Sequence, residues 1–363
     1  MIIDNLLNKE TLNKDELVYL LGCNSDEMPK LFSKAAEVKD RYIGRKVYFR
    51  GLIEMSNICR KNCLYCGIRS GNTKVHRYNL TDEEVVKAAS FAWENRYGSI
   101  AIQTGEVNTK EFTGRIEQLL EKINKATNYE LGITLSLGEQ TEETYRRWFN
   151  KGAIRYLLRI EASNRDLYTK LHPNDGHHDF DERLQCLKAL KRIGYQVGTG
   201  VMIGLPFQTL EHLADDLLWM QEMDVDMVGM GPYVEHPDTP LYQYRDSLLP
   251  ITERFNLALK MTALLRILMK DINIVAPTAL QAIDPLGREK AIKVGANVIM
   301  PNITPGAYRN DYKLYENKPC TDDSADECMS CIEARIRLTG DEIGYGEHGN
   351  SKHYYRRIRN DNQ

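Results

Sequence analysis

Three cysteines lie within eight residues in the segment Cys59-Arg-Lys-Asn-Cys63-Leu-Tyr-Cys66. Three thiolates on one loop can bind a soft metal centre such as an iron–sulfur cluster. A structural zinc site needs a fourth protein ligand nearby, and no second Cys or His pair follows. Three cysteines leave one iron of a 4Fe–4S cube free to bind a substrate or cofactor. The spacing therefore favours a reactive cluster over three thiols that lie close together by chance.

A second set of three cysteines lies near the end of the chain, at Cys320, Cys328 and Cys331. This set could hold zinc, a 2Fe–2S cluster or a second 4Fe–4S cluster, and the alternative is a thiol-rich tail without a metal. Cys23 and Cys186 lie in helical patterns and are expected to be ordinary thiols.

The elements that must position the first cysteines alternate regularly along the chain. Short β-rich runs, separated by amphipathic helical patterns, lie at 47–55, 99–105, 131–138, 154–162, 196–206, 226–233, 272–280 and 296–302. Such alternation predicts parallel strands with right-handed crossovers, and eight strands can close a barrel. We therefore predict an α/β fold, a complete (β/α)8 TIM-type barrel with an N-terminal helical extension and a short C-terminal tail. A doubly wound open sheet is the alternative, but no glycine-rich phosphate turn follows the first strand.

The predicted division of the chain has three parts. Residues 1–45 show helical spacing and form the N-terminal helical extension, and residues 46–307 form the barrel. Residues 308–363 form a C-terminal extension that is polar and irregular and carries the accessory cysteine motif. In a barrel of this kind the chemistry lies at the carboxyl ends of the strands.

Composition excludes several classes of protein. A formal charge of −3 leaves no basic surplus for a nucleic-acid backbone. Hydrophobic residues make up 42% and charged residues 27%, as in ordinary globular proteins. No stretch approaches the roughly 20 apolar residues of a membrane span, and the first residues do not resemble a signal peptide. We expect a cytoplasmic protein, in which cysteines serve metal or redox chemistry more often than disulfides.

Polar residues mark the ends of the second and third predicted strands. The second ends in Gln103-Thr-Gly-Glu106, where exposed backbone and a carboxylate can bind a ligand ammonium. The third carries Thr134 and Ser136, two residues apart and hence on one face. These hydroxyls face either a wet barrel interior or the solvent.

The fourth strand carries Arg159 and Glu161, which share a face by alternation. Charges inside a barrel are costly unless they are paired. The two residues either form a purely structural ion pair or bind the charged ends of a ligand. Arg183, at the start of the following helix, can reach the same end of the barrel, and Thr278 lies at the end of the seventh strand.

The C-x₃-C-x₂-C spacing, with the aromatic Tyr65 before the last cysteine, resembles the signature of the radical S-adenosylmethionine (SAM) superfamily. Longer segments are similar to the HydE family, the radical SAM maturases of FeFe-hydrogenase, and they extend from about residue 46 to 331. These segments are GLIEMSNICRKNCLYCGIR, QTGE, TLSLGE, RYLLRIEASN, MIGLPFQT, DMVGMGPYVEHPDTPL, GREKAIKVGANVIMPNITP and YRNDYKLYENKPC. Biotin synthase and methylornithine synthase are less similar relatives with the same barrel.

The resemblance implies roles for individual residues. Cys59, Cys63 and Cys66 would hold the 4Fe–4S cluster, and Cys320, Cys328 and Cys331 match an accessory cluster site of the family. Residues on positions that bind SAM are Tyr65, Glu106, Ser136, Glu161 and Arg183, with Met227, Met300 and Tyr312 around the adenosyl part. Residues on positions that line the catalytic cavity are Gln103, Thr134, Arg159 and Thr278.

The resemblance also implies the reaction and its partners. The family cleaves SAM reductively to a 5′-deoxyadenosyl radical, which attacks a cysteine-bound iron carbonyl cyanide precursor at the cysteine sulfur. HydG-like and HydF-like maturases would precede and follow this step, and a ferredoxin or flavodoxin would donate the electron. Two other hypotheses remain: a radical SAM mutase or sulfur-inserting enzyme, and a non-enzymatic iron–sulfur carrier. A carrier, however, needs no polar residues at the strand ends.

Overall fold

The computed structural model describes residues 2–319 and 325–360. Eight parallel strands of one sheet follow each other in the order β10-β1-β2-β3-β4-β5-β7-β9. Their bounds are β1 Lys46–Ser56, β2 Ser99–Thr104, β3 Gly132–Ser136, β4 Arg155–Leu157, β5 Gln196–Thr199, β7 Met227–Val228, β9 Asn273–Ile274 and β10 Val298–Ile299. Each strand overlaps one of the eight β-rich runs of the sequence, so the predicted TIM-type succession of strands is confirmed.

The two outermost strands of this series, β9 and β10, also approach each other. An isolated parallel bridge joins Val275 to Val298. The Asn297 amide donates to the Ile274 carbonyl and the Ala276 amide to the Val298 carbonyl, both at 2.9 Å. Closure into a complete barrel stays a prediction.

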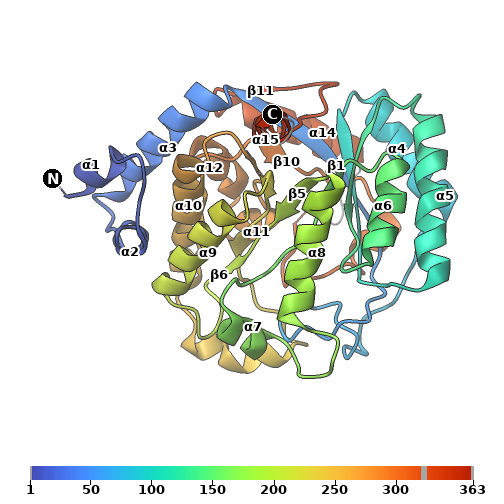
Figure 1. The fold of residues 1–363 in the computed structure, drawn as a ribbon, viewed down its shortest axis with the longest axis horizontal. Coiled ribbons are helices and arrows are strands. Elements are labelled where there is room, and N and C mark those ends of the chain that lie inside the picture. Colours follow the sequence, from blue (N-terminus) through green and yellow to red (C-terminus); the bar gives the residue numbers. More distant parts are fainter. Residues whose placement is uncertain (1, 320–324, 361–363) are drawn as a thin grey trace.

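Helices surround the sheet on its outer side (Figure 1). Those that follow the strands are α4 Asp82–Glu94, α5 Lys110–Ala126, α6 Glu142–Asn150, α7 Arg165–Leu171, α8 Phe180–Ile193, α9 Leu210–Glu222, α10 Ile251–Leu268, α11 Thr278–Ile283, α12 Gly287–Lys293 and α13 Gly306–Arg309. Thr81 begins α4 as a capping residue, because its hydroxyl accepts a hydrogen bond from the Glu84 amide at 3.2 Å. Buried apolar residues such as Ile102 on β2 and Ile116 on α5 form the core between sheet and helices.

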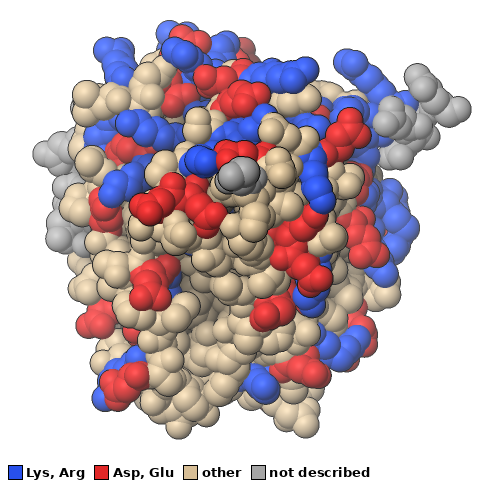
Figure 2. Space-filling model, turned by 90° about the vertical axis from the view of Figure 1, so that its left-hand side faces the viewer, with Lys and Arg blue, Asp and Glu red and all other residues tan. Residues whose placement is uncertain are grey.

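The first residues form three helices, α1 Ile2–Leu7, α2 Lys14–Leu21 and α3 Met28–Tyr42. Their apolar residues are buried, including Leu17, Leu31 and Ala35. Helix α3 packs along α10 and α2 packs along α9, at one side of the molecule (Figure 1). On this side, charged residues of both signs are interspersed in the upper part and at the lower edges, and the middle of the lower part is largely uncharged (Figure 2).

The C-terminal residues differ from the expected irregular tail. They include α14 Ala325–Arg337, β11 Glu342–Ile343 and α15 Lys352–Asn360. β11 pairs in parallel with the start of β1, and Arg357 on α15 forms an ion pair of 2.7 Å with the buried Asp226. The prediction of an irregular segment is wrong here because partners distant in sequence stabilise these polar elements. None of the described helices is long and apolar enough to cross a membrane.

The two ends of the strand series carry different segments. We call the end with the carboxyl termini of β1–β4, the loop 57–66 and α7 the mouth, and the opposite end, with β11 and α15, the floor (Figure 1). A short second sheet of β6 Met202–Ile203 and β8 Gly231–Pro232, with the 3₁₀ helix Pro240–Ser247, extends the mouth.

Candidate cofactor site at the mouth of the barrel

The loop that carries the first three cysteines follows β1 directly and is fastened to the end of β2. The Gly105 amide donates to the Ser56 carbonyl, and the Arg60 amide donates to the Glu106 carbonyl, both at 2.9 Å. The Glu106 amide donates to the Cys59 sulfur at 3.3 Å. A side chain at position 105 would place its Cβ 2.3 Å from the Ile58 carbonyl oxygen. Glycine therefore allows the loop and β2 to come this close.

Other segments hold the rest of the cysteine loop. The Leu64 amide donates to the Leu171 carbonyl at the end of α7, and the Gly67 amide to the Leu314 carbonyl, both at 3.0 Å. The Cys63 sulfur lies 3.6 Å from Nε2 of His178, whose Nδ1 contacts Asp175 at 2.8 Å. The loop is thus held by neighbours on several sides.

The three thiols interact electrostatically with one another, as ligands of one cluster must. Burial, together with the charge of the neighbouring Cys59, raises the pKa of Cys63 to about 12. Burial likewise raises the pKa of Cys59 and Cys66. Among the described residues, no three His, Cys, Asp or Glu side chains are grouped as around a single metal ion. A 4Fe–4S cube binds one thiolate at each of three irons and fits three adjacent thiols, which a bound metal would deprotonate.

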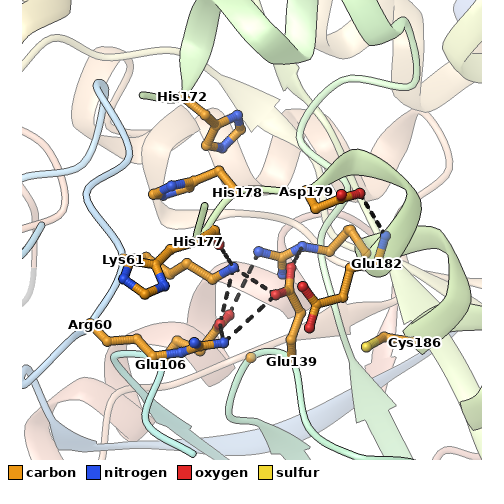
Figure 3. A network of polar contacts seen from close by, with 12 residues as sticks. Arg60, Lys61, Glu106, Glu139, His172, His177, His178, Asp179, Glu182 and Cys186 are labelled. Atoms are coloured by element: carbon orange, nitrogen blue, oxygen red, sulfur yellow. Dashed lines mark hydrogen bonds and ion pairs between the residues drawn. The ribbon is translucent and has the colours of Figure 1, made fainter. Parts of the chain in front are cut away.

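A buried network of charges lies beside this loop (Figure 3). Glu106, at the end of β2, contacts Arg60 at 3.0 Å, Lys61 at 3.3 Å and Arg183 at 3.6 Å. Glu139, just after β3, contacts Lys61 at 2.6 Å and Arg183 at 2.7 Å. Both carboxylates are almost inaccessible to solvent, at 6% and 2% exposed. Three cations and two carboxylates leave this region with one net positive charge.

Sequence reasoning missed Glu139, Lys61 and Arg60 as site residues. A signal was available, because β2 and β3 are each followed by a Gly-Glu pair, Gly105-Glu106 and Gly138-Glu139. Gly138 has a φ of +75°, and a Cβ there would lie 2.2 Å from Cγ of Glu106, so glycine lets the two glutamates lie side by side.

Charge balance sets the pKa values in this network. Burial raises the pKa of the Glu139 carboxyl, although Arg183 opposes the rise. Burial alone would lower the pKa of Arg183, but Glu139 and Glu106 raise it well above its usual value. Arg183 therefore stays a cation beside the ends of β2 and β3, the position from which the sequence expects it to act.

The predicted residues of β2 and β3 face the interior of the strand series. Gln103 pairs in register with Glu54 of β1 on one side and with Ser136 of β3 on the other. Gln103 and Ser136 remain partly accessible, although most of the residues around them along the strands are buried. Thr134 is 2% exposed, and its hydroxyl accepts a hydrogen bond from Arg155 at 3.0 Å. The hydroxyls of β3 therefore face inward.

Arg159 and Glu161 form a two-point ion pair within the barrel. Nε and one terminal nitrogen of Arg159 donate to the two carboxylate oxygens of Glu161, both at 2.9 Å. Arg159 also donates to the Gly229 and Val201 carbonyls, at 2.8 and 3.0 Å. Protein surrounds Arg159, yet 31% of its side chain remains accessible, so it lines a water-accessible interior. Glu161 has a φ of +65°, a conformation rare for a side-chain-bearing residue.

Tyr65 of the cysteine motif lies at the mouth, but the residues expected around the adenosyl part of SAM, Met227, Met300 and Tyr312, do not all lie together. The Tyr65 hydroxyl contacts Nε2 of His172 at 3.2 Å. Burial and then Glu54 raise the pKa of Tyr312, and the nearby Cys66 and Cys59 add to the rise. Met300 is partly accessible just after β10. Met227 instead lies toward the floor, where its sulfur accepts a hydrogen bond from Arg50 at 3.2 Å.

The remaining predicted positions are Thr278 and the second cysteine set. The Thr278 hydroxyl contacts the Tyr315 hydroxyl at 2.8 Å, which joins the start of α11 to the segment after α13. Cys331 is exposed on α14. Cys320 and the side chain of Cys328 lie outside the described residues.

Comparison with known proteins gives consistent results. Residues 53–220 match the model of the radical SAM superfamily. The HydE subunit of the [FeFe] hydrogenase maturase of Thermotoga maritima is 45% identical over 314 residues, 86% of each chain. A 3-methylornithine synthase of Methanosarcina barkeri is 28% identical over 93% of this chain and 92% of its own. The crystal structure of a methylornithine synthase, at 24% identity, has the same fold, with a TM-score of 0.80 over 95% of this chain and 98% of its own.

The superfamily match covers the cysteine loop, the ends of β2 to β4 and Arg183. Membership in this superfamily implies a 4Fe–4S cluster and SAM, which the three adjacent thiols and the neighbouring charged residues fit. The alignment to the maturase covers 86% of the chain, so the likeness extends well beyond residues 53–220. The chain belongs to the HydE family of radical SAM enzymes, which act in FeFe-hydrogenase maturation.

Proposed function

We propose that this enzyme acts on a cysteine-bound iron carbonyl cyanide precursor on the way to the di-iron subcluster of FeFe-hydrogenase. The bound cluster would supply the electron that splits SAM into methionine and a 5′-deoxyadenosyl radical, which attacks the precursor at its cysteine sulfur. One observation carries the proposal. The cysteine loop and its charged neighbours lie at one end of a barrel whose interior keeps Arg159 accessible to water.

The residues at the mouth would bind the two charged ends of the SAM methionyl group. The Glu106 carboxylate would accept hydrogen bonds from the ammonium, and Arg183, with the Ser136 hydroxyl, would bind the carboxylate. Glu161, held by two hydrogen bonds from Arg159, would bind the ribose hydroxyls. In this arrangement the left-handed backbone at Glu161 aims its carboxylate from the end of β4 into the interior.

The substrate would lie below SAM, toward Arg159, Gln103, Thr134 and Thr278. The Arg159 guanidinium, whose side chain is 31% accessible beside Glu161, can still attract an anionic iron complex, because the low-dielectric interior strengthens the attraction. The interior also excludes bulk water from a reactive radical.

We also propose that the eight strands close into a complete barrel, in which residues 46–307 form one unit between the segments 1–45 and 308–363. Strand register supports closure. The register can be followed from strand to strand, starting at Glu54 of β1. Glu54 is level with Gln103 of β2, which is level with Ser136 of β3. The next positions at the same level are Leu157 of β4, Gly198 of β5, Met227 of β7 and Asn273 of β9. When the register is continued from β9 to β10 through the Val275–Val298 bridge, it returns to β1 at Lys46 and not at Glu54, where it began. This offset of about eight residues is the stagger of a closed eight-stranded barrel.

The remaining parts of the proposal concern partners and the second cysteine set. HydG-like and HydF-like maturases would supply the substrate and receive the product in the cytoplasm, with a ferredoxin or flavodoxin as electron donor. Cys320, Cys328 and Cys331 would hold a second 2Fe–2S or 4Fe–4S cluster outside the barrel.

The test is anaerobic. Reconstituted protein is incubated with SAM, a strong reductant and the iron–cysteine complex, and 5′-deoxyadenosine and the complex are quantified together. We expect deoxyadenosine to form while the complex is consumed. Cys63→Ala should lose deoxyadenosine formation by more than about 1,000-fold, because the cluster loses one of its three thiolates. Cys23→Ala, at a thiol after α2 that belongs to neither cysteine set, is the matched control and should retain most of the rate.

Two results would reject the proposal at different levels. Consumption of an amino acid or vitamin precursor, with the iron complex untouched, would favour a mutase or sulfur-inserting enzyme related to methylornithine synthase or biotin synthase. If Cys63→Ala leaves deoxyadenosine formation unchanged, the three-cysteine loop is not the radical-generating site.

A further inference from the structure

Glu139 lies one residue beyond the left-handed Gly138, next to the cysteine loop, and has no role in the function proposed above (Figure 3). We propose that Glu139 is a positioning residue that holds Lys61 and Arg183 and thereby keeps the Glu106 carboxylate available for the ammonium of SAM. This inference rests on the proposed function, since it assumes that Glu106 receives the methionyl amino group.

The distances assign the two cations mainly to Glu139. Lys61 lies 2.6 Å from Glu139 but 3.3 Å from Glu106, and Arg183 lies 2.7 Å from Glu139 but 3.6 Å from Glu106. Only Arg60 is nearer to Glu106, at 3.0 Å against 3.9 Å. Glu139 therefore balances most of the charge of Lys61 and Arg183, and Glu106 keeps part of its hydrogen-bonding capacity.

Because these residues are buried, the pairing of Lys61 and Arg183 with Glu139 affects how strongly Glu106 can bind another cation. Glu139 and Lys61 are each 2% exposed, so water cannot replace a lost partner. Without the charge of Glu139, three cations would share the single carboxylate of Glu106. An incoming ammonium would then compete with three bound cations and meet a larger net positive charge.

Lys61 also connects this network to the cluster loop itself. It lies between Cys59 and Cys63 in the motif, and its ammonium donates to the His177 carbonyl as well as to Glu139. Glu139 thus fixes, through one lysine, the loop that follows β1, the end of β3 and the segment before α8. A loop held in this way keeps the cysteines and Glu106 in a constant relation, as substrate positioning requires.

The test compares SAM with an analogue that lacks only the α-amino group. Both are titrated into anaerobic, reconstituted wild type and Glu139→Gln, and the dissociation constants are measured by calorimetry at equal iron content. We expect Glu139→Gln to bind SAM about ten- to hundredfold more weakly and to bind the deaminated analogue as the wild type does. Glu139→Asp keeps the charge and should recover part of the affinity. The matched control is Glu143→Gln, an exposed glutamate on α6, which should bind both ligands normally.

A second measurement follows the metal-free protein. Hydrogen exchange of the amides in residues 59–66 should become faster in Glu139→Gln, because Lys61 loses its nearest partner. If Glu139→Gln does not fold, Glu139→Asp takes its place, with a smaller but equally selective loss of SAM affinity expected because the shorter side chain holds Lys61 and Arg183 less closely.

The outcomes separate this inference from the proposed function. Equal weakening of SAM and the deaminated analogue would show a general structural role and overturn the inference, as would unchanged affinity for both. If the wild type itself binds no SAM, or binds SAM and its analogue alike, the assignment of Glu106 and the proposed function fail first.

Discussion

The mouth and the floor both bury arginine or lysine, but they balance the charge differently. At the mouth, Lys61, Arg159 and Arg183 each contact a carboxylate within 3.0 Å. At the floor, Arg50 and Arg155 contact neutral groups. Arg50 donates to the Met227 sulfur and the Gly349 carbonyl, and Arg155 donates to the Thr134 hydroxyl, the His348 carbonyl and the Asn350 side chain.

The difference appears in the pKa values. Burial lowers the pKa of Arg50 to about 10, and burial together with Arg50 lowers that of Arg155. Buried nitrogens without a hydrogen-bond partner occur at both ends within the described residues, among them Nε of Arg50 at the floor and Nε of Arg183 at the mouth. At the mouth the carboxylates raise the pKa of Arg183 instead. The comparison teaches that charges paired with a carboxylate, at the mouth and in the Arg357–Asp226 pair of the floor, support the structure, whereas Arg50 and Arg155 remain costly to bury.

Removal of a mouth cation should have the largest effect on stability. Lys61→Met leaves Glu139 and Glu106 buried with fewer counter-charges, and we expect the free energy of unfolding to fall by about 3–5 kcal/mol. Urea unfolding followed by circular dichroism measures the change. Lys122→Met, in a half-exposed pair with Asp82, is the control and should cost less than about 1 kcal/mol. Equal losses in both variants would remove the distinction between the mouth and the surface.

The floor should weaken as the pH rises. His353 on α15 lies between Asp224, at 2.8 Å, and Asp271, at 3.3 Å, and these carboxylates outweigh burial and raise its pKa to about 9. Because the pKa of the folded state exceeds the ordinary value of about 6.5, the stabilisation is complete below pH 6.5 and is lost as the pH rises through 9. We expect it to amount to at most about 3 kcal/mol.

The measurement is the difference in unfolding free energy between wild type and His353→Gln at several pH values. This difference should shrink between pH 6.5 and 9. Leu338→Gln, at an exposed position without a titratable group, provides the control, for which the difference should stay constant with pH. For His353→Gln, a difference that stays constant with pH would mean that the His353 imidazolium does not hold α15 against the floor.

Replacement of a floor arginine should have the smallest effect and the opposite sign. Arg50→Met removes a buried charge and keeps a similar volume, so the free energy of unfolding should rise by about 1–2 kcal/mol. Arg245→Met, at an exposed position, should change it by less than about 0.5 kcal/mol. A loss of more than about 1 kcal/mol in Arg50→Met would mean that its hydrogen bonds to Met227 and Gly349 outweigh the cost of burial.

Local patterns explain which features of the fold could be predicted. The capping residue Thr81 depends on contacts within four residues, and the strand succession depends on alternating apolar runs, so both are readable from the sequence. The Arg159–Glu161 pair is also local, because the two residues are two positions apart, but both lie beyond β4 and Glu161 has a φ of +65°, so strand alternation is not what places them together. The residues of α15 carried no such signal, since the helix depends on Asp226 and Asp224, more than 120 positions earlier.

In the candidate site, too, some residues could be predicted from local sequence and others depend on distant partners. Cys59, Cys63 and Cys66 lie in one motif, and Glu106 and Arg183 lie at predicted element ends, so their chemistry could be inferred before their geometry. Glu139 could not be assigned a partner, because its contact with Lys61 joins two loops that are 78 residues apart. Met227 is the opposite case. It was expected near the SAM site, but the tilt of the strands places it toward the floor, beside Arg50.

The sequence by itself determined the eight strands, the three-cysteine loop and the residue types at the strand ends. These features depend on spacing within a few residues, which the chain specifies directly. The tertiary structure alone decided which charges face each other, at the mouth and at the floor. That outcome depends on the tilt and register of strands distant in sequence, on glycines that permit close approach, and on burial, which turns each buried charge into a requirement for a specific partner.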